Sequence, residues 1–156
     1  MNVTERPWVG SWRLVRHAGF HEWLTARGAS SAEASSNVDS LMNHTELRIS
    51  CDGDGVLFEW VTNVRGRLRR ARTEVRYSLD GVTPTILDGP AGPVSFTARV
   101  DGNDLVHSGG SVALPTETHR RHVEDDLMIQ TMSVEGAAKG DGTWSELIWE
   151  RSRSRR

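Results

Sequence analysis

From residue 45 onward the chain alternates between short apolar-rich runs and polar turn signals. The runs are of strand length, as in residues 56–62, 94–100 and 127–132. The turn signals are Asp52-Gly53-Asp54-Gly55, Asp80-Gly81, Asp88-Gly89-Pro90, Asp101-Gly102-Asn103, Glu124-Asp125-Asp126 and Lys139-Gly140-Asp141-Gly142. Asp-Gly pairs supply the positive φ of tight hairpins. Many short strands at regular spacing predict a sandwich or a barrel.

Alternation within the runs predicts which side chains point inward. One face of residues 71–79 carries Ala71, Thr73, Val75, Tyr77 and Leu79. The neighbouring positions carry Arg70, Arg72, Glu74 and Arg76. Successive strand residues point to opposite faces, so one face is apolar and the other is solvated. With little helix to cover the apolar face, we expect an all-β fold: a closed, antiparallel up-and-down barrel of about ten strands.

Helix is predicted only before residue 45. Phe20, Trp23 and Leu24 stand at i, i+3 and i+4, and Gly28 is a C-terminal stop signal. Residues 30–41 are rich in Ser and Ala and fit either a second short helix or a loop. We therefore expect residues 18–42 to form a helical lid that follows the first strand.

Length and composition place the chain among ordinary globular proteins. At 156 residues it fits a single domain, 1–156, with residues 1–7 and 151–156 expected to be flexible tails. Apolar residues at 37% argue against a disordered chain, and the single Cys51 argues against a disulfide scaffold. The first residues lack the apolar run of a secretory signal, and no stretch is long enough to cross a bilayer. We expect a cytoplasmic protein.

Charge is unevenly placed, although the net charge is only −2. Six arginines lie between Arg65 and Arg76, and four more lie in residues 151–156. Such runs can neutralise phosphates. We interpret them as the solvated face of a strand and a frayed tail, because the overall acidic balance opposes non-specific nucleic-acid binding. No nucleic-acid partner is expected.

Histidine spacing does not predict a metal site. His17 and His21 lie on either side of an expected strand-to-helix junction. His119 and His122 lie on one expected strand, where a separation of three places side chains on opposite faces. The sequence also lacks a Gly-rich phosphate loop and a Gly-x-Ser-x-Gly elbow. We expect neither a metal nor another cofactor.

The N-terminal residues resemble the opening of the intracellular fatty-acid-binding proteins. Residues 8–15, Trp-Val-Gly-Ser-Trp-Arg-Leu-Val, are followed by Phe20, Trp23, Leu24 and Gly28 without a gap in the likeness. The later hairpins are similar to the closing strands of that family and to small bacterial lipocalin-like proteins. This resemblance to the calycin group implies a barrel that encloses a ligand. It also implies that Trp12 plugs the closed end and that the helix residues face the ligand, whereas ordinary core packing is the alternative for each.

In that family two inward arginines and a tyrosine grip the carboxylate of the ligand. By the resemblance, Arg120 stands at the place of the first arginine, while Leu147 and Trp149 replace the second arginine and the tyrosine. Leu and Trp make the cavity drier and remove a bidentate partner of an anion. We therefore expect a neutral or weakly polar polycyclic or polyene ligand.

The expected site is a barrel cavity of roughly several hundred Å³. Its ligand-binding residues are expected to be Phe20, Trp23, Leu24, Phe58, Trp60, Leu147 and Trp149. Its catalytic residues are expected to be Arg120, His122 and Tyr77. Arg120 and His122 share one strand face, which the resemblance places inward. A buried arginine is costly without a partner, and Tyr77 or a ligand oxygen would serve as one.

Two functional classes fit such a cavity. As an enzyme, the protein would fold a flexible substrate and stabilise developing charge without a cofactor. Bacterial barrels of the resembled group include cyclases of polyketide pathways, and the arginine-rich composition resembles that of a GC-rich bacterium. Together with the lost clamp, this favours a cofactor-independent cyclase or isomerase. The alternative is a non-catalytic carrier of a lipid or another hydrophobic ligand. The expected partner is a small hydrophobic molecule, and the expected state is a monomer or a homodimer.

Overall fold

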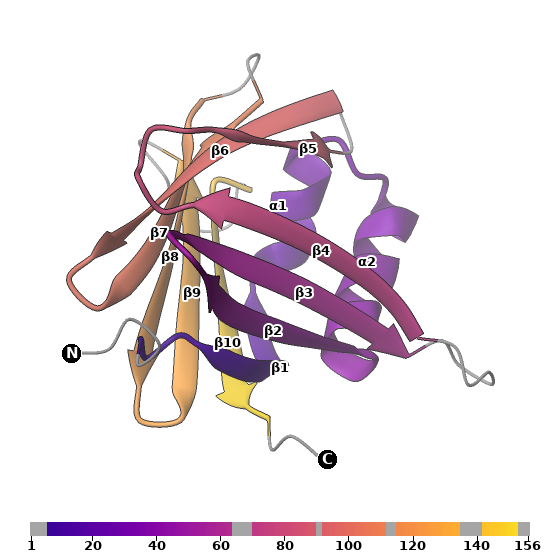
Figure 1. Cartoon of the computed structure of the whole chain (residues 1–156). Coiled ribbons are helices and arrows are strands. Elements are labelled where there is room, and N and C mark those ends of the chain that lie inside the picture. The colour runs from indigo at the N-terminus through magenta and orange to yellow at the C-terminus, as the bar shows by residue number, and fades with distance from the viewer. Residues whose placement is uncertain (1–5, 64–69, 90–91, 112–114, 135–141, 153–156) are drawn as a thin grey trace.

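The computed structural model describes residues 6–63, 70–89, 92–111, 115–134 and 142–152. They form one curled antiparallel sheet of ten strands with two helices beside it (Figure 1). The strands are β1 (Gly10–Ala18), β2 (Thr45–Asp52), β3 (Gly55–Asn63), β4 (Arg70–Ser78), β5 (Thr85–Gly89), β6 (Gly92–Asp101), β7 (Asp104–Gly110), β8 (Glu117–Glu124), β9 (Leu127–Val134) and β10 (Trp144–Arg151). The helices are α1 (Phe20–Ala26) and α2 (Ser31–Asn43), which both lie between β1 and β2.

The strand order makes the sheet a nearly closed barrel. Neighbouring strands follow the order β4-β3-β2-β1-β10-β9-β8-β7-β6-β5, so the first and last strands of the sequence pair with each other. The two edges are β4 and β5, and no ladder joins them in the described residues. They are linked through the Thr85 hydroxyl, which donates to the Arg76 carbonyl at 3.1 Å. The predicted up-and-down barrel is confirmed, with this gap as a correction to full closure.

The predicted helix α1 forms, and the segment left open between helix and loop is a second helix, α2; each begins with a recognisable signal. Gly19 adopts φ 69°, a left-handed conformation that turns the chain from β1 directly into α1. A Cβ at this position would lie 2.8 Å from the Trp144 carbonyl oxygen. Ser30 and Glu33 form a capping box, with hydrogen bonds of 3.1 and 3.0 Å, so the Ser- and Ala-rich segment is a helix. We call α1 and α2 the lid.

The end of the barrel away from the lid is filled by tryptophan. Trp8 and Trp12 are fully buried, and the Trp12 indole donates to the Trp8 carbonyl at 3.0 Å. The Arg151 guanidinium lies 4.3 Å from the Trp12 ring centroid and donates to the Val9 and Pro7 carbonyls. Trp12 therefore occupies the place that the resemblance implied. Arg151 belongs to β10 rather than to a flexible tail, because these contacts hold it.

The apolar and polar faces of β3 and β4 follow the predicted alternation. Phe58 and Tyr77 are buried, whereas Arg72 and Arg76 are exposed. Arg76 pairs with Asp52 at 2.8 Å, as expected for a solvated strand face. Thr73 is an exception, since it shares the face of Tyr77 but is exposed. The arginines and turn residues at 64–69 and 135–141 lie outside the described residues.

None of the helices in the described ranges is long and apolar enough to span a membrane.

Candidate ligand-binding site

A cavity of about 290 Å³ lies inside the barrel beneath the lid. Most of its wall is aromatic or aliphatic, contributed by Phe20, Trp23, Leu24, Leu41, Phe58, Trp60, Tyr77, Leu87, Phe96, Met132, Leu147 and Trp149. Four polar side chains interrupt this wall: His107, His119, Arg121 and Gln130. Trp149 donates its indole proton to Gln130 at 3.0 Å, which leaves that pair internally satisfied. The chemistry of the cavity therefore depends on the other three.

Most of the residues expected from the sequence line this cavity. Phe20, Trp23 and Leu24 reach it from the lid helix α1, and the other four expected ligand-binding residues reach it from strands, namely Phe58, Trp60, Leu147 and Trp149. Tyr77 also lines the cavity. Their contribution to binding stays a prediction, but the sequence placed them on the correct face.

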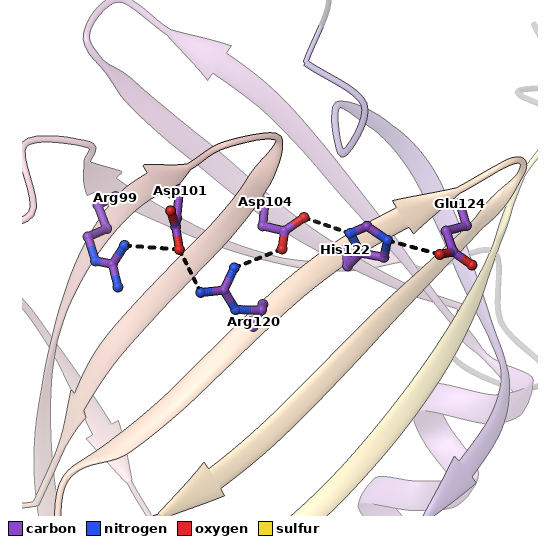
Figure 2. Close-up of polar contacts among 6 residues, drawn as sticks. All are labelled: Arg99, Asp101, Asp104, Arg120, His122 and Glu124. Carbon is purple, nitrogen blue, oxygen red and sulfur yellow. Dashed lines mark hydrogen bonds and ion pairs between the residues drawn. The ribbon is translucent and has the colours of Figure 1, made fainter.

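The expected inward orientation of Arg120 and His122 is wrong. Both lie on the outer face of β8, where Arg120 donates to Asp104 and Asp101 at 2.7 Å each (Figure 2). His122 contacts Asp104 through Nδ1 at 2.7 Å and Glu124 through Nε2 at 3.2 Å. Carboxylates on the β6–β7 hairpin thus hold this face of β8 toward solvent.

The side chains of the outer network shift one another's pKa values toward the charged forms. Hydrogen bonds to Asp104 and Glu124 raise the pKa of His122. Partial burial opposes ionisation of Asp104, but hydrogen bonds from His122 and Arg120 hold its pKa below the ordinary value. These side chains stabilise the wall of the barrel from outside, at a distance from the cavity.

Arg121 is the arginine that points into the barrel. Its side chain is 6% exposed, and its guanidinium carbon lies 4.7 Å from the Phe58 ring centroid. Its closest polar contact is His107 Nδ1, 3.3 Å from Nη1, while its Nε is buried without a hydrogen-bond partner in the described part of the chain. No carboxylate of the described residues pairs with it. Burial lowers its pKa to about 10, so it stays charged at neutral pH.

His107 and Tyr77 flank this guanidinium. The His107 ring lies 4.4 Å from the Tyr77 ring and 5.3 Å from the Phe58 ring, centroid to centroid. Burial, together with the charges of Arg121 and His119, holds the pKa of His107 well below its usual value. The neutral imidazole accepts from Arg121 through Nδ1 and therefore carries its proton on Nε2. Burial also raises the pKa of the Tyr77 phenol, which Arg121 partly opposes.

A second polar cluster joins the lid to β8. Glu117, 5% exposed, accepts from Arg27 Nε at 2.8 Å and contacts His119 Nε2 at 2.9 Å. Arg27, the C-cap of α1, also donates to the carbonyls of Trp23 and Gly142 and lies 3.3 Å from the Trp23 ring centroid. We call Arg27, Glu117 and His119 the lid latch. It leaves Glu117 fully paired inside the protein.

Within the lid latch, burial and ion pairing shift the pKa values in opposite directions. Burial lowers the pKa of His119, and Glu117 only partly offsets this. Burial alone would raise the pKa of Glu117, but hydrogen bonds and charge from His119 and Arg27 lower it. Glu117 is thus ionised at neutral pH. Because Arg27 and His119 already engage Glu117, it does not neutralise Arg121.

Sequence reasoning missed Arg121, His107 and the lid latch. A usable signal was present, because Glu117, His119 and Arg121 alternate along one strand face. The signal was ambiguous because all four positions from His119 to His122 are basic, so alternation alone does not show which face of β8 points inward. The outer carboxylates Asp101 and Asp104 determine which face of β8 points outward. Their proximity to β8 arises only from strand pairing.

No protein-family model and no curated protein matches the sequence. Solved structures resemble the fold over nearly its whole length. A fatty acid binding protein of Schistosoma mansoni in complex with arachidonic acid gives a TM-score of 0.74 at 15% identity and covers 96% of this chain and 99% of that one. The REP1-NXSQ fatty acid transporter gives 0.71 at 17% identity, covering 94% and 97%. The wild-type fluorescent protein UnaG gives 0.68 at 21% identity, covering 93% and 97%.

Proposed function

We propose that this barrel, which has the fold of the fatty-acid-binding proteins, encloses one small, largely apolar molecule that bears a single anionic group, and carries it unchanged. The observation that carries the proposal is Arg121, a charged guanidinium in an otherwise apolar cavity with no carboxylate partner in the described residues. A buried charge is costly unless it is paired. An anionic group on the ligand would supply the pair, and guanidinium binds a carboxylate in a bidentate way.

This proposal differs from the neutral ligand that the sequence favoured. Leu147 and Trp149 stand where the resemblance places the second arginine and the tyrosine. The part of the cavity wall that β10 forms therefore carries no charge. With one arginine remaining and no internal counter-ion for it among the described residues, an acidic ligand is better matched than a neutral one. Two of the similar structures are described as a fatty acid binding protein and a fatty acid transporter, which supports carriage.

The cyclase hypothesis loses two of its three expected catalytic residues. Of its three expected catalytic residues, Arg120 and His122 lie outside the barrel and are held by carboxylates, so only Tyr77 meets the cavity. General acid-base chemistry needs a group within hydrogen-bond reach of the reacting atoms. The case for turnover is therefore weaker than it was from the sequence, whereas the apolar cavity with Arg121 in its wall supports binding.

A fluorescent anion tests the proposal. We expect 8-anilinonaphthalene-1-sulfonate to bind the purified protein, with its emission enhanced and the fluorescence of the cavity tryptophans quenched. Arg121→Gln should weaken this binding about tenfold or more, because a desolvated charge pair is lost. Arg120→Gln is the matched control on the outer face of the same strand and should leave the affinity unchanged. Equal effects of the two variants would contradict the assignment.

A second measurement separates carriage from catalysis. Any compound that binds competitively with the probe is incubated with the protein, extracted and analysed by chromatography and mass spectrometry. We expect recovery of the compound unchanged. An isomeric product that forms with wild-type protein and not with Arg121→Gln would overturn the carrier assignment in favour of an enzyme.

A further inference from the structure

The cavity also constrains the class of ligand, and this inference rests on the proposed function. Its volume of about 290 Å³ lies just below the range, roughly 300–1,000 Å³, that small-molecule sites occupy. A ligand that fills it is compact. A long flexible chain would have to be folded inside it and would lose the rotational freedom of every bond.

The walls present ring faces and ring edges in fixed positions. Phe58, Tyr77 and His107 form one group of mutually perpendicular rings, with centroids 4.4 to 5.5 Å apart. Trp23 and Phe96 form a second group around His119, at 5.7 and 5.2 Å, also with ring planes nearly perpendicular. Aromatic pairs prefer offset-stacked or edge-to-face contacts, so such walls favour a flat ring over a puckered one.

The charge lies directly against the first group of rings. The Arg121 guanidinium is 4.7 Å from the Phe58 ring centroid and 3.3 Å from the His107 ring nitrogen. When an acidic group of a ligand pairs with Arg121, the neighbouring atoms of that ligand therefore lie beside aromatic side chains. A ligand that uses both features carries its acid on the ring system, without a long spacer.

We infer that the ligand is a compact aromatic carboxylic acid, in which the carboxylate is attached directly to a flat ring system. The carboxylate pairs with Arg121, and the ring lies among Phe58, Tyr77 and His107 on one side and the Trp23 and Phe96 rings on the other. Planarity and charge are both required. Loss of either weakens binding.

Four probes of defined chemistry test this inference by isothermal titration calorimetry. They are 2-naphthoate, its neutral amide 2-naphthamide, the saturated and puckered decahydro-2-naphthoate, and palmitate. We expect 2-naphthoate to bind more tightly than 2-naphthamide by about tenfold or more, since a buried charge pair is at stake. It should exceed decahydro-2-naphthoate by about fivefold, the worth of one or two aromatic contacts, and should also exceed palmitate.

Variants assign these differences to residues. Arg121→Gln should abolish the preference of naphthoate over naphthamide, Arg121→Lys should retain part of it, and Arg120→Gln should retain all of it. Phe96→Leu should reduce the preference of naphthoate over its saturated analogue. Thermal unfolding of each variant tests whether it is folded. If Arg121→Gln does not fold, Arg121→Lys, which keeps the charge, still tests the role of this position.

The outcomes separate the inference from the proposed function. Palmitate or decahydro-2-naphthoate binding as tightly as naphthoate would overturn the aromatic class and leave an acid carrier standing. Naphthamide binding as tightly as naphthoate would overturn the role of the carboxylate. Failure of all four probes, together with failure of the fluorescent anion, would overturn both the inference and the proposed function.

Discussion

Arg121 is the residue at which stability and binding oppose each other. Its charge is desolvated within the barrel, and its closest polar neighbour is the neutral His107. Desolvation is also what lowers its pKa to about 10. The same isolation strengthens its attraction for a ligand anion, because water does not compete for it.

Replacing this charge should therefore stabilise the protein. We expect Arg121→Met to raise the free energy of unfolding by about 1 kcal/mol or more, as happens when buried ionic groups are exchanged for apolar ones. Urea unfolding followed by circular dichroism measures this. Arg120→Met, which removes partly exposed ion pairs, should instead lower stability by about 1 kcal/mol or less. A larger loss from Arg121→Met than from Arg120→Met would show that Arg121 is satisfied within the protein.

Residue-scale prediction from sequence succeeded where one strand face was apolar and failed where both were polar. Phe58, Trp60, Leu147 and Trp149 line the cavity as expected, because burial of aromatic side chains determines their direction. On β8 neighbouring positions were equally basic, so alternation could not choose between Arg120 and Arg121. The choice depends on carboxylates of the β6–β7 hairpin, which are distant in the sequence.

At the scale of elements, the lid is held to the barrel by the lid latch. Arg27 connects α1 to Glu117 on β8 and to the Gly142 carbonyl just before β10. Both charged side chains are largely buried, at 15% and 7% exposed. Breaking such a pair on one side leaves an uncompensated buried charge, which is strongly destabilising.

We expect Arg27→Gln to lower the free energy of unfolding by about 2 kcal/mol and to speed amide hydrogen exchange in α1. Denaturant titration and exchange mass spectrometry measure the two effects. The double variant Arg27→Gln/Glu117→Gln should recover part of the loss, since no charge is then left unpaired. Arg72→Gln removes an exposed arginine that pairs with Glu59 and Glu74, and should change stability by about 0.5 kcal/mol or less. If exchange in α1 stays unchanged in Arg27→Gln, the latch does not hold the lid.

The elements themselves were largely predictable, because their signals are local. The i, i+3, i+4 spacing of Phe20, Trp23 and Leu24 indicated α1, and Asp-Gly turns indicated the hairpins. The second helix was left open between helix and loop, and its capping box is a local signal that resolves it. The gap between β4 and β5 was not predictable, since it depends on how the whole sheet curls.

For the whole molecule, buried histidines set the response to pH. His107 and His119 have pKa values below 6.5, so the unfolded chain binds more protons than the folded one as pH falls through that value. His122 acts in the opposite direction, because its pKa is raised, but it is largely solvated and its effect is screened. The depressed pKa values of Asp104 and Glu117 matter only in more acidic solution.

We therefore expect stability to rise between pH 5 and pH 7, by up to about 1.4 kcal/mol per pH unit for each proton. Melting temperatures at several pH values in this window measure the rise. His107→Phe should flatten it, whereas His122→Gln should steepen it slightly. A melting temperature that falls as pH rises would show that the buried histidines are protonated in the folded protein.

The pairing of β1 with β10 places Trp12 opposite Arg151, residues near the two ends of the chain. Among the described strands, every other ladder joins strands that follow each other along the chain. Closing a long loop costs entropy before its contacts form, and such non-local pairing slows folding. The order of events in time then follows from topology: the hairpins form early, and the β1–β10 seam forms late. Damage to that seam, at Trp12 for example, should quicken unfolding far more than it delays folding.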